Sequence, residues 1–379
     1  MNSLGTIRIP EPMPMGSYPP GDVTFLLKDL SDVRLERESA ERERVIQGGG
    51  HYSESLPIEY RPTAEYVELF HKTLRDNAEA LALATGTVAE LILSKRGQGV
   101  VLASLARAGT PIGVLIKRYV KAIHGYDWPH YSLSIIRGKG IDENALLYIH
   151  QRHGLSAVQF VDGWTGKGAI RKVLSEACRD FGHKYGIAMN DDLAVLADPG
   201  QCAETFGTRD DYLIPSACLN ATVSGLMSRT VLRGDLIGAG DFHGAKFYRE
   251  WLEEDLSNLF VDEVSKHFEA VQAEARSRAD RLLADPAAAE TTWQGLKDIE
   301  RIQRDFGIED VNLVKPGVGE TTRVLLRRVP WRILVNKLDN PELRHIMLLA
   351  KDRGVPVEVY PELTYSCCGI IKPVRGESE

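Results

Sequence analysis

Short apolar runs alternate with helical segments through the middle of this 379-residue chain. The apolar runs have the length and residue types of buried strands, and they lie at 99–104, 131–136, 157–162 and 193–198. Segments in which apolar residues recur at helical spacing separate them, at 112–122, 144–154 and 169–185. Strands joined by helices predict an α/β fold, with a parallel sheet covered by helices on both faces. Ligands of such sheets bind beyond the carboxyl ends of the strands.

The rest of the chain divides around this core, which we expect to span 85–244. Residues 1–84 form an N-terminal arm followed by helices, because Pro, Gly and Met dominate the start and helical spacing appears towards the end. Residues 245–310 are a charged helical connector. Residues 311–379 show a strand, a helix and a second strand, which predicts a small, separate α/β domain.

The composition is that of a globular protein, with 43% hydrophobic and 26% charged residues. No apolar run reaches the roughly 18 residues of a membrane span, and no secretory leader is evident. The five scattered cysteines form neither a disulfide framework nor a zinc pair, so we expect a cytoplasmic protein without membrane contact. Residues 311–379 contain 11 Lys and Arg against 8 Asp and Glu in a chain of net charge −7, which weakly favours an anionic partner for that segment.

The most informative segment is the loop Phe160-Val-Asp-Gly-Trp-Thr-Gly-Lys-Gly-Ala169, which follows a predicted strand and begins a helix. Backbone N–H groups at such a helix start bind phosphate. A Walker A loop is excluded, because Val161 stands where the first glycine is needed and Gly168 follows Lys167. A dinucleotide Gly-x-Gly-x-x-Gly is absent. Two interpretations remain: the ribose-phosphate loop of type I phosphoribosyltransferases, which this loop resembles, and a tight turn without a ligand. The first assigns an acidic role to Asp162 and phosphate contacts to Thr165, Gly166, Lys167 and Gly168.

Two further segments suit a diphosphate. The stretch at 102–113 follows an earlier strand and begins a helix, and its small residues and arginine could bind pyrophosphate oxygens. The residues concerned are Ser104, Arg107, Ala108 and Gly109. Between the two loops, Arg137 and Lys139 alternate with glycines in a segment that could close over the ligand, or could equally be a solvated hairpin tip.

Several motifs together resemble one bacterial family. They are Gly16-Ser-Tyr-Pro-Pro, Gly49-Gly-His-Tyr-Ser-Glu, Ser134-Ile-Ile-Arg-Gly-Lys-Gly-Ile-Asp, Phe160-Val-Asp-Gly-Trp-Thr-Gly-Lys-Gly and Ile214-Pro-Ser-Ala-Cys-Leu-Asn220. The family is the phosphoribosyltransferase-like family of tellurite-resistance and stress-response operons, which is also labelled cysteine protease StiP. The stretch from Gly317 to Trp331 resembles the Pelota-type RNA-binding domain that follows in that family.

The resemblance implies a type I phosphoribosyltransferase-like core that binds phosphoribosyl diphosphate and Mg²⁺ and transfers ribose 5-phosphate to or from a nitrogenous base. Asp162, Arg137 and Lys139 would then be the catalytic residues, and Mg²⁺ would bridge phosphate and ribose oxygens. One departure bears on activity: the usual loop has paired acids, and here the second position is Gly163. The residues do not indicate a protein metal ligand, the identity of the base or an oligomeric state.

Two alternatives stay open. The protease label would make Cys218 a nucleophile with His243 as its base, which requires the thiol within hydrogen-bond reach of the imidazole. A cysteine among apolar neighbours is more often a buried structural residue than a nucleophile. The other alternative is a catalytically inactive protein that binds nucleotide or RNA, which Gly163 favours and the intact turn opposes.

For the C-terminal domain we expect binding of structured RNA. A helix is predicted after the glycines Gly317 and Gly319. Arg323 and Arg327 are four residues apart on this helix, so their side chains lie on the same face. A solvated basic face without a ligand is the competing interpretation, and the Pelota-type resemblance favours RNA. The residues predicted to contact RNA are Thr321, Thr322, Arg323, Arg327 and Arg328.

Overall fold

The computed structural model describes residues 9–38, 41–42, 44–45, 49–59, 61–328 and 330–372, together with the backbone but not the side chain of Arg327. Its centre is a seven-stranded sheet in the order β1-β6-β5-β8-β9-β10, with the short β7 beside β6. All pairs along this path are parallel, and only β7 runs antiparallel. The strands are β1 (Thr24–Leu26), β5 (Val101–Ala106), β6 (His130–Ile136), β7 (Gly140–Ile141), β8 (Val158–Trp164), β9 (Leu193–Ala197) and β10 (Thr205–Thr208).

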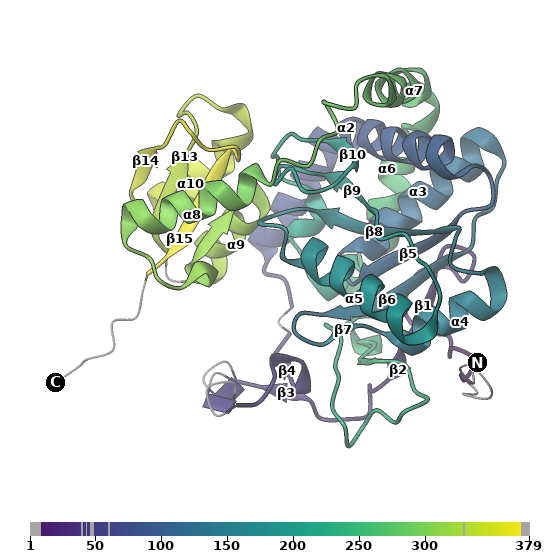
Figure 1. Ribbon diagram of the computed structural model, residues 1–379. Coiled ribbons are helices and arrows are strands. Elements are labelled where there is room, and N and C mark those ends of the chain that lie inside the picture. The colour runs from purple at the N-terminus through teal and green to yellow at the C-terminus, as the bar shows by residue number, and fades with distance from the viewer. Residues whose placement is uncertain are drawn as a thin grey trace.

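Helices cover both faces of this sheet (Figure 1). Residues alternate along β5, so that Leu102 packs towards one face while Val101 and Ala103 pack towards the other. The helices on the Leu102 face are α2 (Ala64–Arg96), α3 (Gly109–His124), α6 (Ser257–Ser265) and α7 (Phe268–Ala284). The opposite face is covered by α4 (Glu143–His153) and α5 (Ala169–Tyr185).

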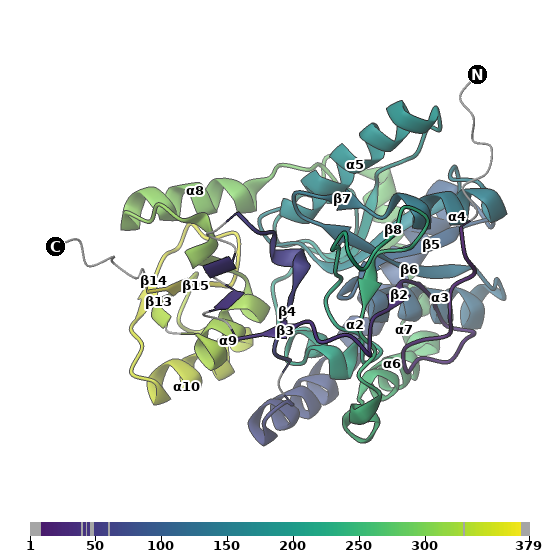
Figure 2. The ribbon, with the colours of Figure 1, turned by 90° about the horizontal axis from the view of Figure 1, so that it is seen from below.

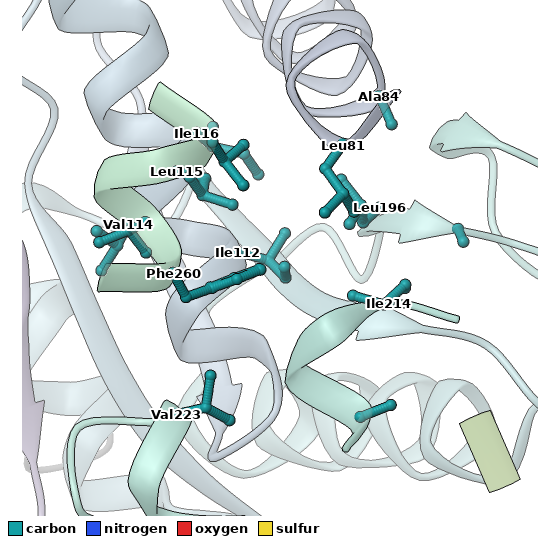
Figure 3. Close-up of a cluster of buried hydrophobic side chains, with 14 of the residues drawn as sticks. Leu81, Ala84, Ile112, Val114, Leu115, Ile116, Leu196, Ile214, Val223 and Phe260 are labelled. Carbon is teal, nitrogen blue, oxygen red and sulfur yellow. The ribbon is translucent and has the colours of Figure 1, made fainter. Parts of the chain in front are cut away.

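The larger core lies on the α2 side of the sheet. Figure 3 shows side chains from α2, α3, α6 and β9 that converge there, including Leu81, Ile112, Leu196 and Phe260. Each of these four side chains is fully buried. Burying a side chain of this size contributes about 1.5–3 kcal/mol, so the cluster fixes α2 and α3 against the sheet.

The C-terminal domain has its own four-stranded sheet, in the order β12-β15-β13-β14, and lies beside the core in both views (Figures 1 and 2). Its elements are α8 (Gln294–Phe306), β12 (Val314–Pro316), α9 (Val318–Arg327), β13 (Pro330–Val335), α10 (Arg344–Asp352), β14 (Val357–Val359) and β15 (Cys367–Ile371). One face packs on Ile299 and Ile302 of α8. The other face, with Val318 and Leu325 of α9, is continuous with the main apolar cluster of the core. The two domains therefore share buried apolar surface.

Short elements complete the chain. The strand pairs are β2 (Lys28–Asp29) with β11 (Gly244–Ala245), and β3 (Glu36–Arg37) with β4 (Leu56–Pro57). The 3₁₀ turns are η1 (Tyr52–Glu54), η2 (Pro215–Ala217), η3 (Ala221–Val223), η4 (Arg249–Glu254), η5 (Val311–Leu313) and η6 (Pro341–Leu343). Within the described residues, no helix has the length and apolarity that crossing a membrane requires.

The α/β core with a parallel sheet and the small C-terminal domain are confirmed, and the finer assignment to the type I phosphoribosyltransferase fold stays a prediction. The domain boundaries in the structure differ from those predicted from the sequence. Helix α2 runs without a break through the predicted boundary at residues 84 and 85. The predicted connector is not a separate unit, because α6 and α7 pack on α2 whereas α8 belongs to the C-terminal core.

Candidate functional site

A crevice lies where the strand order of the sheet reverses. After β5 the chain adds β6 on one side and β8 on the other, so the connections that leave the adjacent carboxyl ends of β5 and β8 run to opposite faces of the sheet, and ligands of parallel sheets bind at such a point. The cavity there has a volume of about 270 Å³. The ends of β5 and β8, the segment 216–224, Arg229 and Arg323 of α9 line it, so both domains contribute. We call this cavity the crevice.

Asp162 is the one carboxylate among the described residues that line the crevice. It lies within β8, which continues two residues further than the sequence indicated, and the backbone N–H of Gly163 donates to Asp162 Oδ1 at 2.7 Å. Burial raises the pKa of Asp162 from 3.8 to about 7, and the Gly163 hydrogen bond opposes this shift. A carboxyl with such a pKa can exchange a proton at neutral pH, which makes it the acid–base candidate of the crevice.

Three arginines, Arg107, Arg229 and Arg323, line the crevice together with Asp162. Arg107 follows β5 and pairs with Glu59, with both nitrogen–oxygen distances at 3.3 Å. Arg323 donates to Glu320 at 2.8 Å and to the Ala217 carbonyl at 3.0 Å. Arg229 keeps an exposed side chain, and within the described chain its guanidinium makes no hydrogen bond or ion pair. The lining of the crevice is therefore mainly positively charged, and among the described residues Arg229 is the arginine of this lining that has no acidic partner.

The turn after β8 does not form an open phosphate site. Thr165 is buried and donates to Asp198 Oδ1 at 2.6 Å. Lys167 Nζ donates to the Val311 carbonyl at 2.6 Å, and burial lowers its pKa to about 8. A Cβ on Gly168 would lie 2.3 Å from the Trp293 ring. The C-terminal half of the chain thus packs against this turn, whose hydroxyl and ammonium are already bonded.

Other residues predicted to bind the ligand also make contacts within the fold. Ser104 is fully buried, with Oγ 2.7 Å from His130 Nε2. Gly109 begins α3 so close to β8 that a Cβ would lie 2.4 Å from the Val161 carbonyl oxygen. Ala108 and Arg107 do line the crevice, as expected. Gly166 packs similarly, since a Cβ on Gly200 would lie 2.0 Å from its carbonyl oxygen.

Arg137 and Lys139 lie at the exposed tip of the β6–β7 hairpin, which matches the competing interpretation of a solvated hairpin tip, and their closing over a ligand stays a prediction. The backbone N–H of Arg137 donates to the Tyr52 hydroxyl at 2.8 Å, and its guanidinium lies 5.7 Å from the centre of the Tyr52 ring. Neither side chain lines the crevice.

All five cysteines are buried, and within the described residues none forms a disulfide. Burial raises the pKa of Cys178, Cys202 and Cys368 to about 12 each. Burial likewise raises the pKa of Cys367. These four thiols are therefore protonated at neutral pH and lack the thiolate that a nucleophile needs.

Cys218 differs from the other cysteines in its position. It follows η2, and its neighbours Ser216, Leu219 and Asn220 line the crevice, although its own side chain is fully buried. The predicted partner His243 is also buried, and its Nδ1 lies 2.9 Å from Ser134 Oγ. Burial lowers the pKa of His243, which keeps the ring neutral near pH 7. His243 does not line the crevice.

The predicted RNA contacts divide into two groups. Thr321 and Thr322 are buried within α9, and Thr322 Oγ1 donates to the Val318 carbonyl at 2.7 Å, so we withdraw both as surface contacts. Arg323 is half-buried and lines the crevice, and Arg328 is exposed. The side chain of Arg327 lies outside the described part of the structure.

Sequence reasoning did not single out Arg229 or Glu59. The stretch at 220–230 is rich in hydroxyls and contains one arginine, a composition that also suits a helix packed through small residues. The structure instead folds it into η3 and irregular backbone, which brings Arg229 to the crevice. An arginine in a small, hydroxyl-rich stretch was the available signal.

Known proteins resemble this chain along most of its length. A protein-family model described as "Tellurite-like stress resistance cysteine protease StiP" matches residues 16–265, and a model of the Pelota RNA-binding domain matches residues 293–373. A curated relative, "Cysteine protease StiP" of Acinetobacter baylyi, is 34% identical over 354 residues, covering 91% of this chain and 90% of the relative.

Solved structures are far less similar. A NifS-like protein from Rickettsia africae is 11% identical with a TM-score of 0.20, covering 92% of this chain and 93% of that protein. A probable N-succinyldiaminopimelate aminotransferase from Thermus thermophilus is 11% identical with a TM-score of 0.19, covering 68% and 71%. Scores this low support no conclusion about fold or function.

These similarities correct the predicted activity. The prediction of a phosphoribosyltransferase is wrong, because both the matching family model and the curated relative are described as cysteine proteases. The geometry agrees, since Thr165 and Lys167 are bonded within the fold. The predicted Mg²⁺ depended on the diphosphate and stays a prediction; the described residues contain no cluster of three or more His, Cys, Asp or Glu side chains that could hold a metal ion. The chain belongs to the StiP family of tellurite-like stress resistance proteins and ends in a Pelota RNA-binding domain.

Proposed function

We propose that this protein is a stress-resistance cysteine protease in which Cys218 attacks a peptide bond held in the crevice. The observation behind the proposal is the position of Cys218: the residues on both sides of it, Ser216, Leu219 and Asn220, line the crevice. None of the five cysteines lines the crevice itself, but the other four have no chain neighbours in its lining, and burial raises their pKa. The family description adds support, because the matching family and relative are both described as cysteine proteases.

The chemistry requires two events. First, the segment around Cys218 must open towards the crevice, because the thiol is fully buried. Second, a base must take the thiol proton, so that the thiolate forms a bond to the peptide carbonyl carbon and the amine leaves with a proton. Asp162, with a pKa of about 7, lines the same crevice and suits this role at neutral pH. The nearby guanidiniums would stabilise the negative charge that develops on the carbonyl oxygen.

The test compares proteolysis by the wild type, Cys218→Ala and Cys178→Ala. The Cys178 thiol is equally enclosed but lies on α5, against the opposite face of the sheet, so it serves as the matched control. Peptide mixtures are incubated with each protein and the products identified by mass spectrometry. We expect cleavage by the wild type and Cys178→Ala and none by Cys218→Ala. Cleavage by Cys218→Ala at the wild-type rate, or none by the wild type, would overturn the proposal.

A second function, binding of RNA, is supported by a separate observation. The Pelota match covers residues 293–373, and within it Arg323 and Arg328 of the α9 region remain accessible, unlike Thr321 and Thr322. We also propose a reducing, cytoplasmic location, because cysteines that form no disulfides are typical of compartments that keep thiols reduced. Filter binding of the full chain to stem-loop RNAs, with Arg328→Ala beside the wild type, tests the RNA function: equal binding at every salt concentration would exclude Arg328 as a contact.

A further inference from the structure

We infer that the crevice binds a phosphate of an RNA strand that the C-terminal domain holds, with Arg229 of the core as its main ligand. This goes beyond the proposed protease, because it assigns RNA contacts to the core domain. It also differs from RNA binding by the C-terminal domain alone, since two of the three arginines concerned, Arg107 and Arg229, are outside that domain.

The first argument is the state of Arg229. Its guanidinium lines the cavity, and within the described residues no acidic side chain pairs with it. Burial and, after it, the positive charge of Arg107 lower the pKa of Arg229 to about 10, and Glu59 offsets only part of this shift. A bound anion would relieve this repulsion, and a guanidinium matches phosphate oxygens with two parallel hydrogen bonds.

The second argument is that the crevice is built by both domains. Arg323 of α9 reaches across to the Ala217 carbonyl of the core at 3.0 Å, and its guanidinium lies 5.5 Å from the centre of the Trp164 ring. Trp164 lines the same cavity. An aromatic ring beside cations is the usual arrangement for single-stranded nucleic acid, because a base stacks on the ring while its phosphate meets the positive charge.

The third argument concerns the surface beyond the crevice. Besides burial, Lys315 and Arg137 lower the pKa of Lys167, so these three cations lie near one another at the junction of the domains. Burial lowers the pKa of Lys315, Glu320 opposes this shift, and Arg328 and Arg137 add to it. A group of cations at the junction of the domains fits a polymeric anion better than an isolated one.

The size of the cavity indicates what part of the RNA enters. Small-molecule pockets measure about 300–1,000 Å³, and the crevice, at about 270 Å³, is slightly smaller than that range. A single nucleotide of an unpaired strand fits this size, whereas a duplex does not. The RNA match of the C-terminal domain favours this occupant over an acidic peptide.

The experiment measures binding of the full-length protein to a fluorescein-labelled single-stranded 12-nucleotide RNA by anisotropy, across a salt series. Arg229→Gln removes the charge in the crevice. Arg281→Gln is the matched control, because Arg281 is an exposed arginine on α7 that pairs with Glu274. We expect Arg229→Gln to weaken binding roughly 10- to 100-fold, as for loss of a charged hydrogen bond, and to lower the salt slope by about 0.7, as for one phosphate of a single strand. Arg281→Gln should match the wild type.

Three results would overturn the inference. Equal affinity of Arg229→Gln and wild type would remove Arg229 from the RNA site, and an equal loss in Arg281→Gln would mean that any surface charge has this effect. Competition by adenosine monophosphate at the same nucleotide concentration as the RNA would identify a site for free nucleotides.

A second variant, Arg229→Lys, keeps the charge and loses the paired hydrogen bonds. Its affinity for the RNA should lie between those of the wild type and Arg229→Gln, and it replaces Arg229→Gln if that variant does not fold. Peptide cleavage is not measured here, so failure of the protease proposal would be seen separately.

Discussion

The carboxylate of Asp211, in the core, lies at the N-terminus of α9 in the C-terminal domain, where it accepts a hydrogen bond from the backbone N–H of Val318 at 3.0 Å. Its other oxygen accepts the N–H of Ser366 at 2.8 Å. Both donors belong to the C-terminal domain, and the negative carboxylate lies at the positive end of α9. Asp211 therefore joins the two domains.

Removing this carboxylate should loosen the junction of the domains. Asp211→Ala leaves two N–H groups without their acceptor, and each unsatisfied buried group costs about 1–3 kcal/mol. We expect a loss of about 2 kcal/mol or more in the free energy of unfolding measured with urea. The neighbouring exposed Asp210 provides the control, since Asp210→Ala should change that free energy by less than about 0.5 kcal/mol. Similar values for both variants would show that Asp211 does not join the domains.

Asp162 should make the protein less stable as the pH rises. Its pKa is about 7 in the folded protein against an ordinary value of 3.8, so the folded state binds this proton more tightly than the unfolded state. The stability that comes from this tighter proton binding is fully present below about pH 4 and is lost as the pH rises to about 7. Asp162→Asn should therefore melt at a higher temperature than the wild type at pH 8 and show little difference at pH 4. A constant difference across this range would contradict the raised pKa.

The same carboxyl should set the pH dependence of proteolysis. A base must be ionised to accept the thiol proton, so cleavage should increase as the pH rises through about 7. Asp162→Asn should lose at least tenfold in rate, in line with removal of a general base, and should lose this rise. If His243→Ala removes the rise and Asp162→Asn keeps it, His243 is the base and our assignment is wrong.

RNA and peptide should compete if both occupy the crevice. Saturating single-stranded RNA is expected to slow peptide cleavage by the wild type, because it would lie against the segment that contains Cys218. The inhibition should be weaker in Arg229→Gln and unchanged in Arg281→Gln. Equal inhibition of all three proteins would place the RNA elsewhere.

The repeating core could be predicted from the sequence because its signals are local. The run at 169–185 coincides with α5, and the predicted strands correspond to β5, β6, β8 and β9. Strands β1 and β10 were missed because they are short and lie at the sheet edges, next to residues far away in the chain. Apolar periodicity identifies an element but not its distant partner.

The site was only partly predictable for the same reason. Asp162 lies near the carboxyl end of β8 and Arg107 follows β5, and these strands are neighbours, so the place of both residues in the crevice could be predicted from topology. The covering of Lys167 by the Val311 carbonyl could not be foreseen, because 144 residues separate the two. The same holds for Arg229 and Arg323, which reach the crevice from a loop and from another domain.

Trapping the nucleophile tests the central claim most directly. The protein is incubated with a peptide vinyl sulfone, which forms a stable thioether with an activated cysteine, and the modified residue is located by peptide mass spectrometry. We predict a single adduct on Cys218 that requires folded protein and is suppressed by excess peptide substrate. An adduct on another cysteine, or labelling of Cys218 only after unfolding, would contradict its role as the nucleophile.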